Sequence, residues 1–134
     1  MNLNYNWVEN NIFIQIQGTL NLEILLETNA IVFSNPKFDY MNYQIIDLTK
    51  VEDTDITPRE IKAFSLLHKS AVRWNSSVHV AIVISNLQLK KDFEIYIQEM
   101  KWTNWKCKLF ENINDANHWC LKQIQTEVNI NNRI

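Results

Sequence analysis

Carboxylates gather in one short segment of the chain, at residues 52–55. Glu52, Asp53 and Asp55 follow an apolar run that ends on Asp47. Such a group could bind a cation, or act as a general acid and base. The spacing is not that of an EF-hand loop, and a solvated turn whose charge favours the start of the next helix explains it more simply. We therefore predict no metal ion and no cofactor at this segment.

The histidines and cysteines form no ligand motif. His68, His79 and His118 fall in different predicted elements, and no H-x-x-H, H-E-x-x-H or C-x-x-C pattern is present. Cys107 and Cys120 are predicted to be reduced, buried small hydrophobes. An enzyme would need a histidine, Asp47 and the acidic segment to lie together in one pocket. We therefore predict a protein that is not an enzyme.

Composition removes several further classes of function. The 134 residues are 46% apolar and carry a formal net charge of -2, which does not suit a general nucleic-acid binder. Gly18 is the only glycine, so glycine-rich phosphate loops are excluded, and it is expected to end a strand. No apolar run reaches membrane-spanning length, and the first residues lack the pattern of a secretory signal. We expect a cytoplasmic protein without a membrane span.

The hydrophobic pattern predicts one α/β domain. Strands are expected at residues 3–8, 11–17, 43–48, 78–84 and 107–110. Helices are expected at residues 20–33, at 58–74, after Ser85-Asn86, and at 115–128. The second helix begins with the residue types of a capping box, which are Thr57, Pro58 and Glu60. The order is therefore ββαβαβαβα, with residues 129–134 as a polar C-terminal tail.

Three segments resemble the STAS-like domains, named for sulfate transporters and anti-sigma-factor antagonists. They are QIIDLTKVEDTDITPREI at 44–61, VHVAIVISN at 78–86 and KLFENINDANHWCLKQI at 108–124. The last is most similar to the SpoIIAA-like, free-standing bacterial branch described as STAS/SEC14-like, although Cys120 separates Trp119 from Leu121. The resemblance implies a single SpoIIAA-like domain over residues 1–128, with a mixed, mostly parallel five-stranded sheet and about four helices.

The resemblance also locates a regulatory position. In the antagonists, a D-S-S-G segment begins the helix after the central strand, and its first serine is the phosphorylation switch. Asp55, Ile56, Thr57 and Pro58 occupy these positions here, so isoleucine replaces the acceptor serine. The resemblance therefore implies a regulatory domain without that switch, in which Thr54 and Thr57 are the remaining candidate acceptors.

The second and third predicted helices carry the other candidate site. We expect a protein partner, or a second copy of the chain, to bind through the second helix and the adjoining loop. The alternative is a carrier or sensor of a small apolar ligand that lies between these two helices. The candidate residues for both uses are Phe64, Leu67, Phe93, Tyr96, Met100 and Trp102.

Overall fold

The computed structural model describes the backbone of residues 2–132, and the side chains of residues 2–122 and 124. Its strands are β1 (Leu3–Val8), β2 (Asn11–Asn21), β3 (Tyr43–Asp55), β4 (His79–Val83) and β5 (Lys106–Phe110). Its helices are α1 (Leu22–Phe33), the 3-10 helix η1 (Pro36–Tyr40), α2 (Pro58–Ala71), α3 (Leu87–Met100) and α4 (Ile113–Asn132). The predicted order ββαβαβαβα is confirmed.

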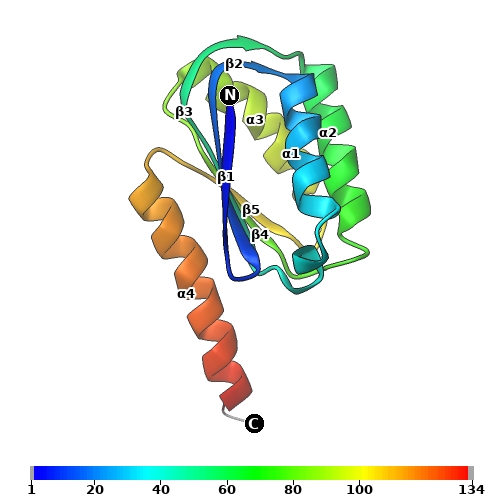
Figure 1. The fold of residues 1–134 in the computed structure, drawn as a ribbon, viewed down its shortest axis with the longest axis vertical. Coiled ribbons are helices and arrows are strands. Elements are labelled where there is room, and N and C mark those ends of the chain that lie inside the picture. Colours follow the sequence, from blue (N-terminus) through cyan, green and yellow to red (C-terminus); the bar gives the residue numbers. More distant parts are fainter. Residues whose placement is uncertain (1, 133–134) are drawn as a thin grey trace.

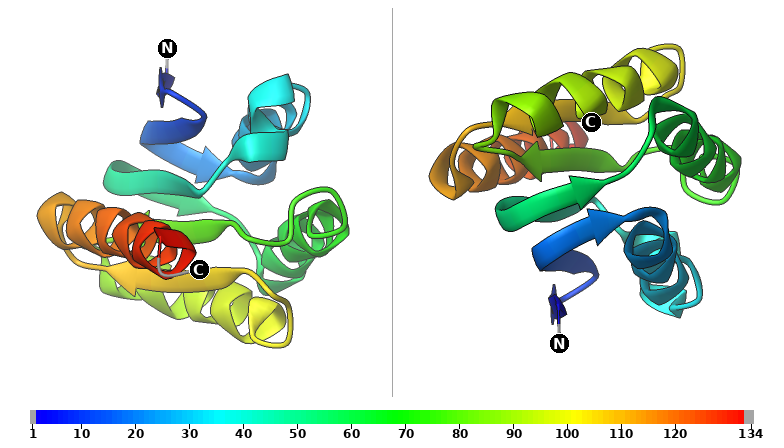
Figure 2. Two further views of the ribbon diagram at one scale, coloured as in Figure 1. Left: turned by 90° about the horizontal axis from the view of Figure 1, so that it is seen from below. Right: turned by 90° about the horizontal axis from the view of Figure 1, so that it is seen from above.

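The five strands form one sheet in the order β1-β2-β3-β4-β5. β1 is antiparallel to β2, whereas β2, β3, β4 and β5 are parallel neighbours. Each connection between two parallel strands leads to the next strand in the same direction across the sheet. Connections of the same hand therefore place their helices on the same face. α1, α2 and α3 lie on that face, and α4 lies on the other (Figures 1 and 2). The predicted mixed, mostly parallel sheet is also confirmed.

The sheet separates two apolar cores. The larger one lies beneath α1, α2 and α3. The smaller one lies beneath α4, where Ile45, Ala81 and Val83 of the sheet meet Ala116 and Cys120. The second half of α4 extends past the end of the sheet (Figure 1). The domain boundary at residue 128 stays a prediction, and no helix in the described part of the chain is long and apolar enough to cross a membrane.

β2 and β3 are both longer than predicted. β2 continues through Gly18 to Asn21, and β3 continues through the acidic segment to Asp55, which pairs with Asn21. Two shifts of register occur near Gly18, whose φ is +80°. A glycine in this conformation lets a strand bulge without ending. The expectations that Gly18 ends the strand and that the carboxylates lie in a loop are therefore wrong.

Side-chain caps begin the three crossover helices. Asn21 and Asn86 cap α1 and α3, through bonds to the N–H groups of the third residue beyond each. At α2, Thr57 Oγ1 accepts a hydrogen bond from Glu60 N (3.2 Å), and Glu60 Oε1 accepts one from Thr57 N (3.0 Å). The predicted capping box is confirmed, although α2 ends at Ala71 rather than at residue 74.

Thr57→Ala should lower the free energy of unfolding by about 1 kcal/mol, because it leaves a backbone N–H of the first helical turn without its acceptor. Urea unfolding monitored by circular dichroism measures this loss. Ser76→Ala, at an exposed position after α2, is the control and should change little. Equal stability of the Thr57→Ala and Ser76→Ala variants would show that the box contributes nothing.

Candidate functional site

Four of the six candidate residues, all on α2 or α3, lie together inside the larger core. Phe64, Phe93 and Tyr96 are fully buried, and Met100 is 1% exposed. The ring centroids of Phe64 and Tyr96 are 5.6 Å apart, and those of Phe93 and Tyr96 are 6.4 Å apart. These side chains therefore pack α2 and α3 against each other and the sheet, and they present no surface to a partner.

A chain of hydrogen bonds joins the helices within this core. Asn29 Oδ1 lies 2.9 Å from His68 Nε2, and an amide oxygen can only accept, so Nε2 carries the proton. His68 Nδ1 must then accept from the Tyr96 hydroxyl, which lies 2.7 Å away. The Tyr96 oxygen lies 3.6 Å from Cys107 Sγ. Asn29, His68, Tyr96 and Cys107 thus link α1, α2, α3 and β5.

Burial keeps every group of this chain neutral at physiological pH. It lowers the pKa of His68 to about 3, because the imidazolium would lose its hydration. Burial raises the pKa of Tyr96 well above its usual value, and it raises the pKa of Cys107 to about 12, although the hydrogen bond with Tyr96 opposes the latter shift. A neutral imidazole and a protonated thiol at these positions are structural groups, because a nucleophilic cysteine needs a lowered pKa.

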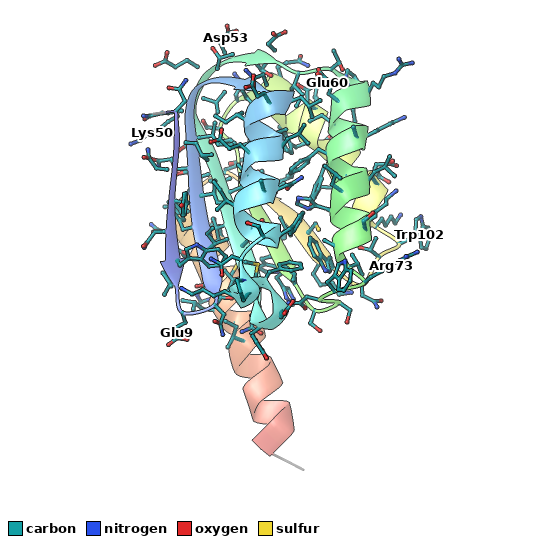
Figure 3. The ribbon with its side chains drawn as sticks, turned by 45° about the vertical axis from the view of Figure 1, so that its right-hand side comes forward. Glu9, Lys50, Asp53, Glu60, Arg73 and Trp102 are labelled. Atoms are coloured by element: carbon teal, nitrogen blue, oxygen red, sulfur yellow. The ribbon has the colours of Figure 1, made fainter. Side chains whose placement is uncertain are left out.

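The carboxylates and His68 do not converge. Asp53 and Asp55 are exposed at the end of β3 (Figure 3 labels Asp53). Asp47 is 5% exposed on the sheet face that α4 covers, where it accepts hydrogen bonds from Gln15 and from the N–H and hydroxyl of Thr49. The sheet therefore stands between Asp47 and His68. Within residues 2–122, no three histidine, cysteine or carboxylate side chains are grouped as around a metal ion.

The segment that matches the switch of the antagonists is held by the fold. Ile56, at the position of the acceptor serine, is half-buried and packs against the larger core. The Thr54 hydroxyl is buried, with no hydrogen-bond partner in the described structure, so an enzyme cannot reach it in the folded protein. Thr57 is exposed, but its side chain is the helix cap. Asp55 is exposed as the last residue of β3.

The outer faces of α1 and α2 carry exposed apolar side chains. Leu26 of α1 is 40% exposed, and Leu66 and Leu67 of α2 are 58% and 42% exposed. We call the surface formed by these three residues with Ala30 the α1–α2 face. Sequence reasoning named Leu67 as a candidate but took it as part of the core stripe of α2, and it missed Leu26 and Leu66. A signal was available for Leu66, because it lies outside the three- and four-residue spacing of the apolar side chains of α2.

The borders of the α1–α2 face carry opposite charges. Glu23 and Glu27 are exposed on α1, whereas Arg59 and Lys62 are exposed on α2. Lys69 of α2 is instead directed to α3, where its Nζ lies 3.6 Å from a carboxylate oxygen of Glu99. The face therefore has an acidic edge and a basic edge with an apolar centre.

An apolar hollow of about 670 Å³ opens beside this face, between α1, η1 and α2. A ligand was expected between α2 and α3, but the facing side chains of those helices are buried in the core. Of the six candidate residues, Leu67 is the one that lines the hollow. Its apolar lining consists of Ala30, Phe33, Phe38, Leu67, Ala71 and Trp74.

Two solved structures decide the fold. One is an uncharacterised protein of the DUF3478 family from Shewanella loihica with a SpoIIAA-like fold, matched over 88% of this chain and 91% of that one, at a TM-score of 0.53 and 16% identity. The other is the anti-sigma factor antagonist SpoIIAA in its unphosphorylated form, matched over 90% of this chain and 97% of that one, at a TM-score of 0.58 and 8% identity. The fold is SpoIIAA-like.

The resemblance expected from the sequence is therefore confirmed as a SpoIIAA-like, STAS-like fold. No family model matches the chain, and no curated protein matches it. Similarity at these identities concerns the path of the backbone, so the SpoIIAA-like fold by itself assigns no residue a role.

The buried imidazole predicts a loss of stability in mild acid. His68 binds a proton in the unfolded chain near pH 6.5 but in the folded protein only near pH 3. The unfolded state therefore binds more protons between these values, and the free energy of unfolding should fall by about 1.4 kcal/mol per pH unit below roughly pH 6. Urea unfolding between about pH 7 and pH 5 isolates this effect from most carboxylates, whose usual pKa is about 4.

His68→Gln should remove this pH dependence, whatever its effect on overall stability. His118→Gln, at an exposed position of α4, is the matched control and should retain it. A wild-type protein with constant stability over this pH range would contradict the burial of a neutral His68.

Proposed function

We propose that this protein is a non-enzymatic regulatory domain that acts by binding a protein through the α1–α2 face. The observation that carries the proposal is the apolar centre of this face between an acidic and a basic edge. Leucines at 40–58% exposure are the kind of surface that protein interfaces bury. The SpoIIAA-like fold supports this role, because SpoIIAA itself is described as an antagonist of another protein.

The buried groups support binding rather than catalysis. His68 and Cys107 are neutral inside the core, and the sheet separates His68 from Asp47. Isoleucine at position 56 also favours a domain that is regulated without phosphorylation at this position. Two cysteines with pKa values raised to about 12 are stable as thiols and suit a cytoplasmic location.

The charges of the face favour a second copy of this chain as the partner. A two-fold interface uses the same patch on both protomers, so the patch must complement itself. A two-fold axis between α1 and α2 sets α1 of one copy against α2 of the other. Glu23 and Glu27 then face the basic edge of the partner, and the leucines of both copies bury one another.

Sedimentation velocity over a range of concentrations tests this proposal. The wild-type protein should form dimers, and Leu66→Glu should weaken the dimer by at least about tenfold, because the carboxylate would lose its hydration in the interface. Leu87→Glu is the matched control, since Leu87 is 71% exposed but lies on α3, outside the face. A wild-type protein that stays monomeric up to roughly millimolar concentration would overturn self-association.

A charge exchange distinguishes this interface from non-specific association. Glu27→Lys and Lys62→Glu should each weaken the dimer, because each places like charges across the two-fold axis. The double variant should recover most of the loss, since it exchanges the signs of the two edges. Failure of the double variant to recover would remove the proposed pairing of α1 with α2.

The hollow supports a second candidate, a carrier or sensor of a small apolar ligand. Its volume of about 670 Å³ falls in the usual range for ligand sites, and its walls are largely apolar. Native and denaturing mass spectrometry of gently purified protein would show such a ligand as a mass that is lost on denaturation. Ser70→Trp should abolish that mass by filling the hollow, because Ser70 is exposed and lines it. Identical native and denatured masses would argue against a carrier.

A further inference from the structure

Three chain connections are tied together at the end of the molecule where α2 and α3 finish. They are η1, residues 72–78 between α2 and β4, and residues 101–105 between α3 and β5. Asn75 Nδ2 donates to the carbonyls of Phe38 and Met41, each at 2.8 Å, and Trp105 Nε1 donates to the Asn75 carbonyl at 2.6 Å. Trp105 is 2% exposed. These hydrogen bonds hold the three connections against one another, so that together they form one surface.

Each connection carries one exposed aromatic side chain. Tyr40 is 72% exposed, Trp74 is 78% exposed and Trp102 is 88% exposed. We call the surface that bears them the aromatic end. Arg73 and Trp102 lie at the same corner of the molecule, away from Asp53 and Glu60 (Figure 3). Unlike Trp105, these three side chains contribute little to the core, so the fold does not account for them.

The aromatic end is basic, although the whole chain is acidic. The three connections contain three cations and one carboxylate, which are Lys37, Arg73, Lys101 and Asp39, and Lys106 follows them as the first residue of β5. Glu9 in the β1–β2 hairpin adds a second carboxylate toward this end (Figure 3), which leaves a net charge of +2. The Lys101 ammonium lies 5.4 Å from the ring centroid of Trp102.

The opposite end has the opposite charge. Residues 49–60, 86–92 and 111–115 contain seven carboxylates and four cations, which is a net charge of -3. The molecule is therefore polarised along the direction of its strands. An anionic surface would attract the aromatic end and repel the other, which orients the protein before contact.

We propose that the aromatic end docks on an anionic lipid surface through the corner that bears Arg73 and Trp102, away from the part of α4 that extends past the sheet (Figures 1 and 3). Tryptophan and tyrosine favour the headgroup region of a bilayer, where the ring is partly buried and its polar atom stays hydrated. Lysine and arginine beside them contact lipid phosphates and carboxylates. The aromatic rings come from three separate connections with cations among them, whereas a protein hot spot gathers its anchors around one packed centre. This arrangement favours a bilayer over an acidic protein.

Co-sedimentation with vesicles tests the proposal on the full chain. At low salt the protein should pellet with vesicles of equal parts phosphatidylglycerol and phosphatidylcholine, and it should stay in solution with phosphatidylcholine alone. Trp102→Ala and Arg73→Glu should each lower the partition coefficient by roughly tenfold. Leu87→Ala and Lys50→Glu are the matched controls and should bind as the wild type does, because neither residue belongs to the aromatic end.

Fluorescence quenching by brominated lipid places the aromatic end in the bilayer. Anionic vesicles with brominated chains should quench the wild-type protein more than the Trp102→Phe variant, because the variant keeps only Trp74 of the two tryptophans in the aromatic end, while Trp7, Trp105 and Trp119 remain as the reference. Thermal unfolding of each variant confirms that it is folded. The proposal is overturned if the wild type does not pellet with anionic vesicles, or if Lys50→Glu weakens binding as much as Arg73→Glu.

The proposal goes beyond the α1–α2 face and can fail independently of it. Leu66→Glu should leave vesicle binding unchanged, since Leu66 is on α2 outside the aromatic end. A different outcome is that neither the wild type nor the Trp102→Ala variant binds vesicles, while the variant loses binding to an acidic protein. The surface would then be a protein site, and the lipid proposal would be wrong.

Discussion

A neutral imidazole at the centre of the helical layer fixes how α1, α2 and α3 sit on the sheet. His68 is fully buried and must satisfy both ring nitrogens at once, with Asn29 on one side and Tyr96 on the other. A buried polar group that loses a partner is costly, so a rotation of α2 would be opposed by both bonds. Asn29 Nδ2 is itself buried without a partner in the described structure, so the arrangement persists at some cost.

The orientation of α2 determines what the molecule shows to its surroundings. With His68, Phe64 and Ile61 turned inward, the two leucines at 66 and 67 are left on the outside. The adjacent basic side chains of α2 and acidic side chains of α1 follow from the same orientation. The chain of hydrogen bonds in the core and the α1–α2 face at the surface therefore both follow from the orientation of α2 about its own axis.

Local signals in the sequence were sufficient for the order of elements. The capping box at Thr57 depends on residues three positions apart, and the run at 78–84 needs no partner to be recognised as a buried strand. The extension of β3 to Asp55 was not predictable in this way, because it depends on pairing with β2, about 34 residues earlier. Leu67 is exposed although its spacing from Phe64 and Ala71 places it on the apolar stripe of α2, whereas His68 enters the core only with partners 28 and 39 residues away.

The two cysteines lie on opposite faces of the sheet, Cys107 of β5 with the larger core and Cys120 of α4 in the smaller core. A disulfide requires its two sulfur atoms to bond directly, at a Cα separation of about 4–7 Å. Five hydrogen-bonded strands prevent that approach in the folded chain. A disulfide between Cys107 and Cys120 within one molecule could therefore form only after the sheet had opened. Its detection would show that the molecule had unfolded at least in part.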